Sequence, residues 1–297
     1  MRRLGAALAV VLSGALAPAA AGAGGEALLI GGCMHSDEGE RSVFHTLRAD
    51  GTGARRVRVF PPLPAPLECS ERYPSWAPDG RRFVYIGGGG PMIGSLGSRV
   101  AADRRVTPHG LWPAWSPRGD RIAFVLPLGE DLVALAVVGV GGGPVRELVR
   151  SDLSIEWPSW SPDGRHVLYS TNDVRQPGQI QMYRIAAAGG RPRPLGRGRS
   201  PDQSPDGRLI AFITGDDVWT MRADGSGRRR LVNHAERSMT WRLAWSPDGL
   251  RLAYIHLPVR TGTVSEVRLV RRDGRGRVRV KLPRRVRNPS YVHWRSG

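Results

Sequence analysis

Histidine and carboxylate side chains are the groups in this chain of 297 residues whose chemistry suits metal binding or proton transfer. With Asn172, they lie in polar segments that we expect to form loops on one face of the fold: His35, Asp37, Glu38, Glu40, Glu68, His109, Asp173, Asp216, Asp217, His234 and His256. Their spacing matches no metal motif, because no two histidines stand four residues apart and Cys-x-x-Cys does not occur. We therefore predict no metal and no cofactor; if a metal were bound, His109 and His256 would be its ligands.

A second group of candidate residues is basic and is concentrated near the C-terminus. The chain has 44 Lys and Arg residues against 26 Asp and Glu residues, a formal net charge of +18. In the segment 277–282, cations alternate with apolar residues, so a strand there would be basic outside and apolar inside. Codon bias in a GC-rich genome would also enrich arginine. Five of these side chains are the predicted binding surface: Arg277, Arg279, Lys281, Arg284 and Arg285.

The first 23 residues have the pattern of a secretory signal peptide. Arg2 and Arg3 form a basic start, residues 4–16 are apolar or small, and Ala23 ends a small-x-small cleavage site. An uncleaved membrane anchor is the alternative, but the apolar run is short and interrupted. Cleavage would lower the net charge from +18 to +16 by removing two arginines. We expect an exported mature chain, residues 24–297, that is periplasmic, cell-wall-associated or secreted.

Export bears on both the cysteines and the basic surface. Cys33 and Cys69, the only two cysteines, are predicted to lie on one face of the fold and to form a disulfide, with two free thiols as the alternative. The basic surface would bind a polyanion such as phospholipid headgroups, an anionic cell-wall polymer or an acidic protein. Nucleic acid is not expected, because the chain is exported and no aromatic residues stand between the arginines.

A repeated sequence motif, here called the phrase, predicts the strands and turns that carry these residues. It occurs as YPSWAPDGRRFVYIG from Tyr73, WPAWSPRGDRIAFVL from Trp112, WPSWSPDGRHVLYST from Trp157, SPDQSPDGRLIAFIT from Ser200 and RLAWSPDGLRLAYIH from Arg242. The copies are spaced by about forty residues, which is the period of a propeller blade. Pro, Asp and Gly at fixed offsets form a tight turn, and the Trp before them is predicted to pack between blades rather than to bind sugar.

Each copy continues as a four-stranded antiparallel meander. In the fourth copy, the turn is followed by an apolar run at 208–213, a second run at 218–221, a Gly-bearing turn at 223–227 and a short basic strand. Residues 289–297 resemble the first strand of a further blade, and 27–31, 43–48 and 55–59 supply its other three strands. Pairing the two ends of the chain would remove exposed sheet edges. We predict an all-β, six-bladed β-propeller whose last blade is closed by the N- and C-terminal strands.

The phrase Trp-Ser-Pro-Asp-Gly, followed by an Ile/Leu-Ala-Phe/Tyr run and an Asp-Gly turn, resembles the WD40-like or PD40 repeats of the TolB C-terminal propeller. The resemblance covers residues 27–297 and implies an exported protein that acts by protein–protein contact. Similar repeats form the propellers of prolyl-oligopeptidase-type peptidases and of oligogalacturonate lyases. No Gly-x-Ser-x-Gly elbow occurs in this sequence, and we expect no counterpart of the extra N-terminal domain of TolB, so we expect the chain to depart from these relatives.

Fold alone does not assign a function, so two hypotheses from different classes follow. The first is a non-enzymatic, monomeric propeller that binds an envelope protein or an anionic envelope polymer, with peripheral membrane contact as one form of that binding. The alternative is a propeller hydrolase or lyase acting on an anionic carbohydrate in the central channel. The missing catalytic motifs favour the first hypothesis.

Overall fold

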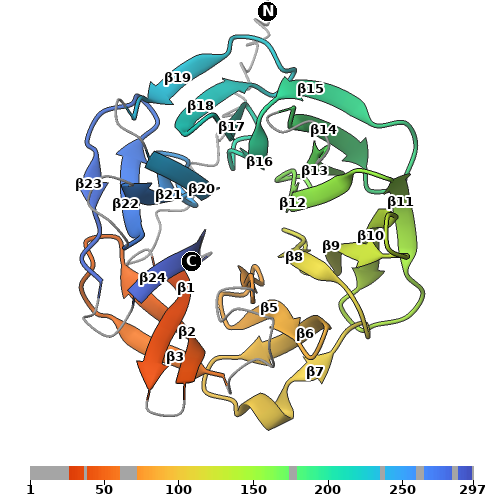
Figure 1. Ribbon diagram of the computed structural model, residues 1–297, viewed down its shortest axis with the longest axis horizontal. Helices are drawn as coiled ribbons and strands as arrows, with labels where there is room; N and C mark the ends of the chain where they lie inside the picture. Colours follow the sequence, from red (N-terminus) through yellow and green to blue (C-terminus); the bar gives the residue numbers. More distant parts are fainter. Residues whose placement is uncertain are drawn as a thin grey trace, which may run out of the picture.

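Six four-stranded antiparallel sheets surround a central channel and form a closed ring (Figure 1). The computed structural model describes residues 27–36, 39–60, 72–173, 179–234, 238–258, 264–282 and 287–295. The predicted signal peptide, residues 1–23, lies outside the described residues. The all-β, six-bladed propeller predicted from the repeats is confirmed.

Each blade runs from an inner strand at the channel to an outer strand at the rim. Blade 1 is β4 (Ser75–Trp76), β5 (Arg82–Gly87), β6 (Gly90–Ser95) and β7 (Arg104–Arg105), and blade 2 is β8 (Leu111–Trp115), β9 (Arg121–Pro127), β10 (Val133–Gly139) and β11 (Arg146–Ser151). Blade 3 is β12 (Ser154–Trp160), β13 (His166–Asn172), β14 (Gln181–Ala186) and β15 (Arg193–Arg197), and blade 4 is β16 (Arg199–Gln203), β17 (Leu209–Thr214), β18 (Asp217–Arg222) and β19 (Arg229–Val232). Blade 5 is β20 (Ser238–Trp245), β21 (Arg251–Pro258), β22 (Glu266–Arg271) and β23 (Val278–Arg279), and blade 6 is β24 (Arg287–Trp294), β1 (Ala27–Ser36), β2 (Gly39–Arg48) and β3 (Arg55–Val59).

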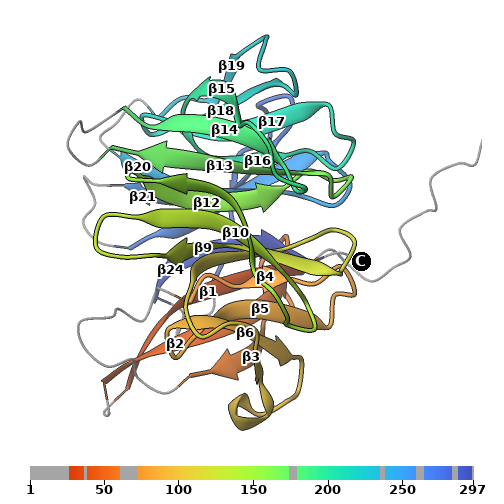
Figure 2. The same ribbon diagram turned by 90° about the vertical axis from the view of Figure 1, so that its right-hand side faces the viewer.

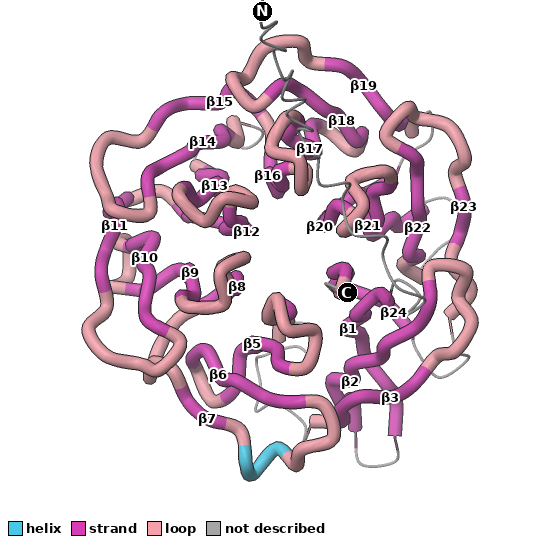
Figure 3. Tube along the Cα trace, turned by 180° about the vertical axis from the view of Figure 1, so that it is seen from behind, coloured by secondary structure: helices cyan, strands magenta, loops and turns pink. Residues whose placement is uncertain are grey.

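Helical structure is confined, within the described residues, to one short 3-10 turn, Val100–Ala102, which follows β6 (Figure 3). The same part of the chain contains no helix that is long and apolar enough to cross a membrane.

The repeated Ser-Pro-Asp-Gly phrase forms the turn between the first and second strands of a blade. In blade 3 the Gly164 N–H donates to the Ser161 carbonyl at 2.8 Å, and Gly164 has a φ of 67°, which glycine adopts without strain. The Ser161 hydroxyl donates to Asp163 Oδ1. In blade 2 the Ser116 hydroxyl donates to Asp120 at 2.8 Å instead, so an aspartate two positions later performs the same role.

Blade 6 joins the two ends of the chain, as predicted. β24 pairs antiparallel with β1, with Leu29 opposite His293, and the Arg295 N–H donates to the Ala27 carbonyl at 2.7 Å. β1 and β2, each of ten residues, then form a hairpin that is longer than the predicted strands and extends at the lower left of Figure 2. Closure in this way leaves no inner strand of the ring unpaired.

Tryptophan side chains hold neighbouring blades together. The Trp160 indole N–H donates to the Ala114 carbonyl of the preceding blade at 3.0 Å, and Trp160 belongs to an apolar cluster with residues of blade 2. Trp245 and Trp294 make the equivalent bonds to Asp202 and Ala244, at 3.1 and 3.0 Å. The prediction that these tryptophans pack between blades is confirmed.

A buried ion pair ties blade 6 to blade 1. Arg58 on β3 contacts Asp103 at 2.9 Å, and the two side chains are only 4% and 1% exposed. Arg58 also donates to the Ser95 carbonyl and the Ser98 hydroxyl, and the Tyr85 hydroxyl donates to Asp103 at 2.6 Å. Both terminal nitrogens of the Arg58 guanidinium and the Asp103 carboxylate therefore have close partners, as a stable buried ion pair requires, while Arg58 Nε has none among the described residues.

Candidate functional site

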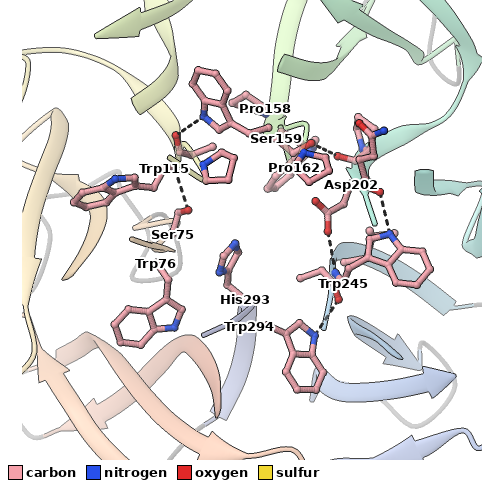
Figure 4. A pocket seen from close by; sticks show the side chains of 18 of the residues that line it. Ser75, Trp76, Trp115, Pro158, Ser159, Pro162, Asp202, Trp245, His293 and Trp294 are labelled. Atoms are coloured by element: carbon pink, nitrogen blue, oxygen red, sulfur yellow. Dashed lines mark hydrogen bonds between the residues drawn. The ribbon is translucent and has the colours of Figure 1, made fainter. Parts of the chain in front are cut away.

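A cavity of about 340 Å³ occupies the end of the channel at which the Ser-Pro-Asp-Gly turns lie (Figure 4). We call this cavity the bowl. Its rim carries one proline from each turn: Pro78, Pro117, Pro162, Pro205 and Pro247. Rigid prolines hold little conformational entropy, so a partner that packs against this rim loses little of its binding energy to ordering it.

A second set of side chains stands three residues before each interblade position, and those of blades 3 to 6 also line the bowl. These ring residues are Tyr73, Trp112, Trp157, Ser200, Arg242 and, in blade 6, Tyr291. The first five have φ between 38° and 55°, a left-handed conformation that is uncommon for residues other than glycine. The register of the inner strand shifts at these positions in blades 2 to 5. A β-bulge therefore places the ring residues of these four blades.

The ring residues contact one another across the channel. The Trp112 ring centroid lies 5.6 Å from that of Trp157, and Tyr73 lies 6.0 and 5.8 Å from these two rings. The Arg242 guanidinium lies 4.8 Å from the Trp157 ring centroid and 4.2 Å from the Tyr291 ring centroid. Cation–π contacts on two rings hold this cation in place at the base of the bowl.

Two titratable side chains extend into the bowl from its wall (Figure 4). The wall positions, one residue before each interblade position, are Ser75, Ala114, Ser159, Asp202, Ala244 and His293. Burial raises the pKa of Asp202 to about 6, against the lowering effects of the Trp245 N–H, which donates to Oδ2 at 2.9 Å, and of Arg242. Burial lowers the pKa of His293 to about 4, so its imidazole is neutral at pH 7. The bowl thus combines aromatic surface, one fixed guanidinium, one carboxyl and one neutral imidazole.

Replacing Asp202 by asparagine is expected to stabilise the protein at pH 7.5. An acid whose pKa is raised on folding contributes stability when protonated, and this contribution is lost as the pH rises from about 4 to about 6. A shift of about two units corresponds to roughly 1 to 3 kcal/mol, which Asp202→Asn should recover while keeping an acceptor for the Trp245 N–H. Urea unfolding at pH 7.5 and pH 4 measures this, and the difference between the two proteins should vanish at pH 4. Equal stability at pH 7.5 would show that Asp202 is not strained by burial.

The bowl lies at the opposite end of the channel from the polar loops in which the sequence placed candidate chemistry. Those loops join second to third strands, or one blade to the next, whereas the bowl is surrounded by the first-to-second-strand turns. Within the described residues, no group of three or more His, Cys, Asp or Glu side chains could hold a metal ion. Asp37, Glu38 and Glu68 lie outside the described residues.

The two histidines named as metal ligands lie in different surroundings. His109 is exposed in the connection between β7 and β8. His256 was expected in a loop, but it lies in β21. There it is 4% exposed, and its ring stacks on the His234 ring with centroids 4.1 Å apart. Burial, followed by the charges of His234 and Arg268, lowers the pKa of His256 to about 3. β21 is longer than predicted, and this difference removes His256 from the loop surface.

The predicted basic surface is present in part. Arg277, Arg279 and Lys281 are exposed near β23 at the outer edge of blade 5, while Arg284 and Arg285 lie outside the described residues. Arg279 is paired with Glu266 at 3.1 Å. The expected alternation fails at Val278, which is 54% exposed, because β23 is only two residues long and covers no core at that point.

Cys33 lies within β1 and is 8% exposed. Cys69 lies outside the described residues, so the Cys33–Cys69 disulfide stays a prediction.

The site residues missed by sequence reasoning are the ring residues, Asp202 and His293. The ring residues could have been found from the third residue before each interblade position, which is Tyr or Trp in four of the six blades. Asp202 also stands where the other copies of the phrase have Ser or Ala. What the repeats alone did not give was the bulge that directs these positions into the channel.

Comparisons with known proteins agree with this architecture. An uncharacterized protein of Agrobacterium fabrum is 27% identical over 72% of this chain and 78% of its own length. The Tol-Pal system protein TolB of Anaeromyxobacter dehalogenans is 34% identical over 38% of this chain, which matches only 27% of that relative's length. The crystal structure of TolB from Acinetobacter baumannii superposes with a TM-score of 0.70 at 17% identity, covering 91% of this chain and 66% of that one, and so shares its fold.

The model of the TolB β-propeller domain, PD40, matches residues 73–293. This match begins at the first ring residue and ends at His293 in the bowl wall, so it includes all five copies of the repeated phrase and most of the closing strand. The chain therefore belongs to the TolB β-propeller domain family.

Proposed function

We propose that the mature protein is exported and acts as a non-enzymatic binding module that holds a protein of the cell envelope at the bowl. The observation that carries this proposal is the bowl itself, a cavity of about 340 Å³ that is surrounded by the turns and lined by the ring residues of blades 3 to 6. A rigid, largely aromatic pocket with a few fixed polar groups is the kind of surface in which one or two side chains of a partner become binding hot spots.

The charges in the bowl fit a polypeptide partner. Arg242 is held between two aromatic rings and can donate hydrogen bonds to a carboxylate of the partner. The Asp202 carboxylate on the wall can accept a hydrogen bond from an N–H or O–H group of the partner. Membership in the TolB family supports a partner from the envelope, because relatives in this family are named as Tol-Pal system proteins. The export step depends on residues 1–23, the predicted signal peptide.

A crosslinked pull-down of the tagged mature protein from its own cell envelope, at low and moderate salt, tests the proposal. We expect one dominant protein to survive moderate salt, because contacts inside the bowl are shielded from the screening that weakens surface charge pairs. His293→Trp, which puts an indole into the bowl, should abolish this retention, and Met239→Trp, at the opposite end of blade 5, should not. Equal retention by both variants would contradict a contact at the bowl.

Two other outcomes would replace the proposal. Retention of anionic polymer alone, and only at low salt, would assign binding to the exposed cations Arg277, Arg279 and Lys281. Turnover of an anionic carbohydrate by the wild type, with loss of this turnover in Asp202→Asn, would show that the protein is an enzyme. Asp202, whose pKa is raised, would then serve as the general acid.

A further inference from the structure

The interface between blades 3 and 4 differs from the other five. In those, the interblade tryptophan packs on a side chain from the preceding blade, an arginine in four cases and Leu209 in one. The pairs are Arg82 with Trp115, Arg121 with Trp160, Leu209 with the cluster containing Trp245, Arg251 with Trp294, and Arg295 with Trp76. Between blades 3 and 4, the equivalent residues are His166 and Gln203. Both members of the pair have been replaced by smaller polar side chains.

A groove of about 510 Å³ opens at this interface, where the indole is missing. We call it the blade 3–4 groove. Its lining includes the faces of Pro162 and Pro205, the side chains of His166, Arg184 and Gln203, and Ala223. The Arg184 guanidinium is anchored by a hydrogen bond of 3.3 Å to the Ala223 carbonyl. Flat proline, imidazole and guanidinium surfaces are suited to contact with an aromatic ring.

One acceptor at this interface, on the Gln203 side chain, lacks a donor. The Gln203 amide donates through Nε2 to the Gly207 carbonyl at 2.8 Å, but its Oε1 is buried without a partner among the described residues. At three other interfaces, an indole N–H donates to the carbonyl of the wall residue in the preceding blade. The wall residue in blade 3 is Ser159, and Gln203 cannot bring an indole to it. A buried acceptor without a donor is costly, so a ligand that supplies an N–H gains binding energy there.

The groove adjoins the bowl, because Pro162, Gln203 and Pro205 line both. A polypeptide held at the bowl is therefore close enough to place a neighbouring side chain between blades 3 and 4.

We propose that the blade 3–4 groove binds a tryptophan side chain of the partner, in the position where the other interfaces carry an indole of this chain. This inference rests on the proposed function only for the source of the tryptophan; the groove and its missing indole are properties of the blades. Tryptophan is the residue most enriched in binding hot spots, and the groove would give it planar contacts and an acceptor for its ring N–H.

N-acetyltryptophanamide, titrated into the purified mature protein and followed by saturation-transfer NMR, tests the groove directly. We expect saturable binding, with a dissociation constant of about 1 mM or below for a ligand of this size, and no binding of N-acetylleucinamide. The double variant Gln203→Trp/His166→Arg rebuilds the pair found at the other interfaces. It should weaken binding of N-acetyltryptophanamide at least tenfold and should keep or raise the thermal midpoint.

Absence of saturable binding to the wild type, or equal binding by the double variant, would overturn the proposal. A large fall in the thermal midpoint of the double variant would also do so, because it would show that no space for an indole exists. Gln203→Ala is a second variant that enlarges the groove without filling it, and it should still bind. His293→Trp, which fills the bowl from blade 6, should leave the binding of N-acetyltryptophanamide unchanged. Failure of the groove is thereby distinguished from failure of the bowl.

Discussion

Replacing Asp103 by alanine is expected to lower the free energy of unfolding by about 3 to 5 kcal/mol, the range found when one member of a buried ion pair is removed. Arg58 is 4% exposed and has Asp103, at 2.9 Å, as its paired carboxylate. Without that carboxylate, the guanidinium stays buried and uncompensated, and the Tyr85 hydroxyl loses its acceptor at 2.6 Å. The pair joins β3 of blade 6 to blade 1, so its loss would weaken the contact between these two blades. Urea unfolding measures the change.

Replacing the whole network provides the control for this prediction. The triple variant Arg58→Met, Asp103→Leu, Tyr85→Phe substitutes apolar side chains of similar size, and it should recover most of the lost stability because no buried charge remains. A change below about 1 kcal/mol for Asp103→Ala, the range typical of exposed pairs, would mean that water reaches Arg58 in solution.

Replacing Trp160 by alanine is expected to destabilise the fold by about 3 to 5 kcal/mol, as for other buried Trp-to-Ala changes. Trp160 is 7% exposed, packs among residues of blades 2 and 3, donates its N–H to Ala114, and lies 5.0 Å from the Arg121 guanidinium. Removing the ring leaves a cavity between two blades and an unmatched arginine. Thermal and urea unfolding measure the loss.

Trp160→Phe separates packing from hydrogen bonding. The phenyl ring keeps most of the buried surface and loses only the N–H, so this variant should cost about 1 kcal/mol from the hydrogen bond, together with a small packing loss. If Trp160→Ala costs no more than Trp160→Phe, the interblade tryptophans do not stabilise the ring through packing. Because blade 4 already carries Gln203 at this position, Gln203→Ala should be far milder than Trp160→Ala.

The fold was predictable because the repeats encode it locally. The Ser-Pro-Asp-Gly turn and the alternating run after it specify a hairpin within about fifteen residues, and five copies at a near-constant period leave few architectures. The composite blade followed from the strand count at the two termini. The strand ends were predicted less accurately than the strands themselves. β1 runs past residue 31, β21 includes His256, which was expected in a loop, and β23 is only two residues long.

The candidate site was not predicted, because it depends on contacts between distant blades. Asp202 and His293 share the bowl wall although 91 positions separate them in the sequence. Arg242 is fixed by Trp157 and Tyr291, which belong to blades 3 and 6. The His and carboxylate residues considered as metal ligands also lie mostly in loops at the end of the channel opposite the bowl. A comparison of equivalent positions across the copies would have been more informative, since it singles out Asp202 and Gln203 as departures.

We propose that an envelope protein contacts the bowl end of the propeller. Two exposed apolar residues in blade 5 allow a matched test. Leu250 lies in the turn at the bowl end and is 53% exposed, while Met239 is the second residue of the inner strand, at the opposite end, and is 50% exposed. A photo-reactive residue placed at either position reports what lies within a few ångströms in the intact envelope.

Photo-crosslinking from position 250 and from position 239, in otherwise identical cells, is therefore the most direct measurement. If the bowl is the binding site, position 250 should give one discrete protein adduct. This adduct should be absent from position 239 and should be lost when His293→Trp is added. Adducts of equal yield from both positions, or from position 239 alone, would contradict a binding site at the bowl.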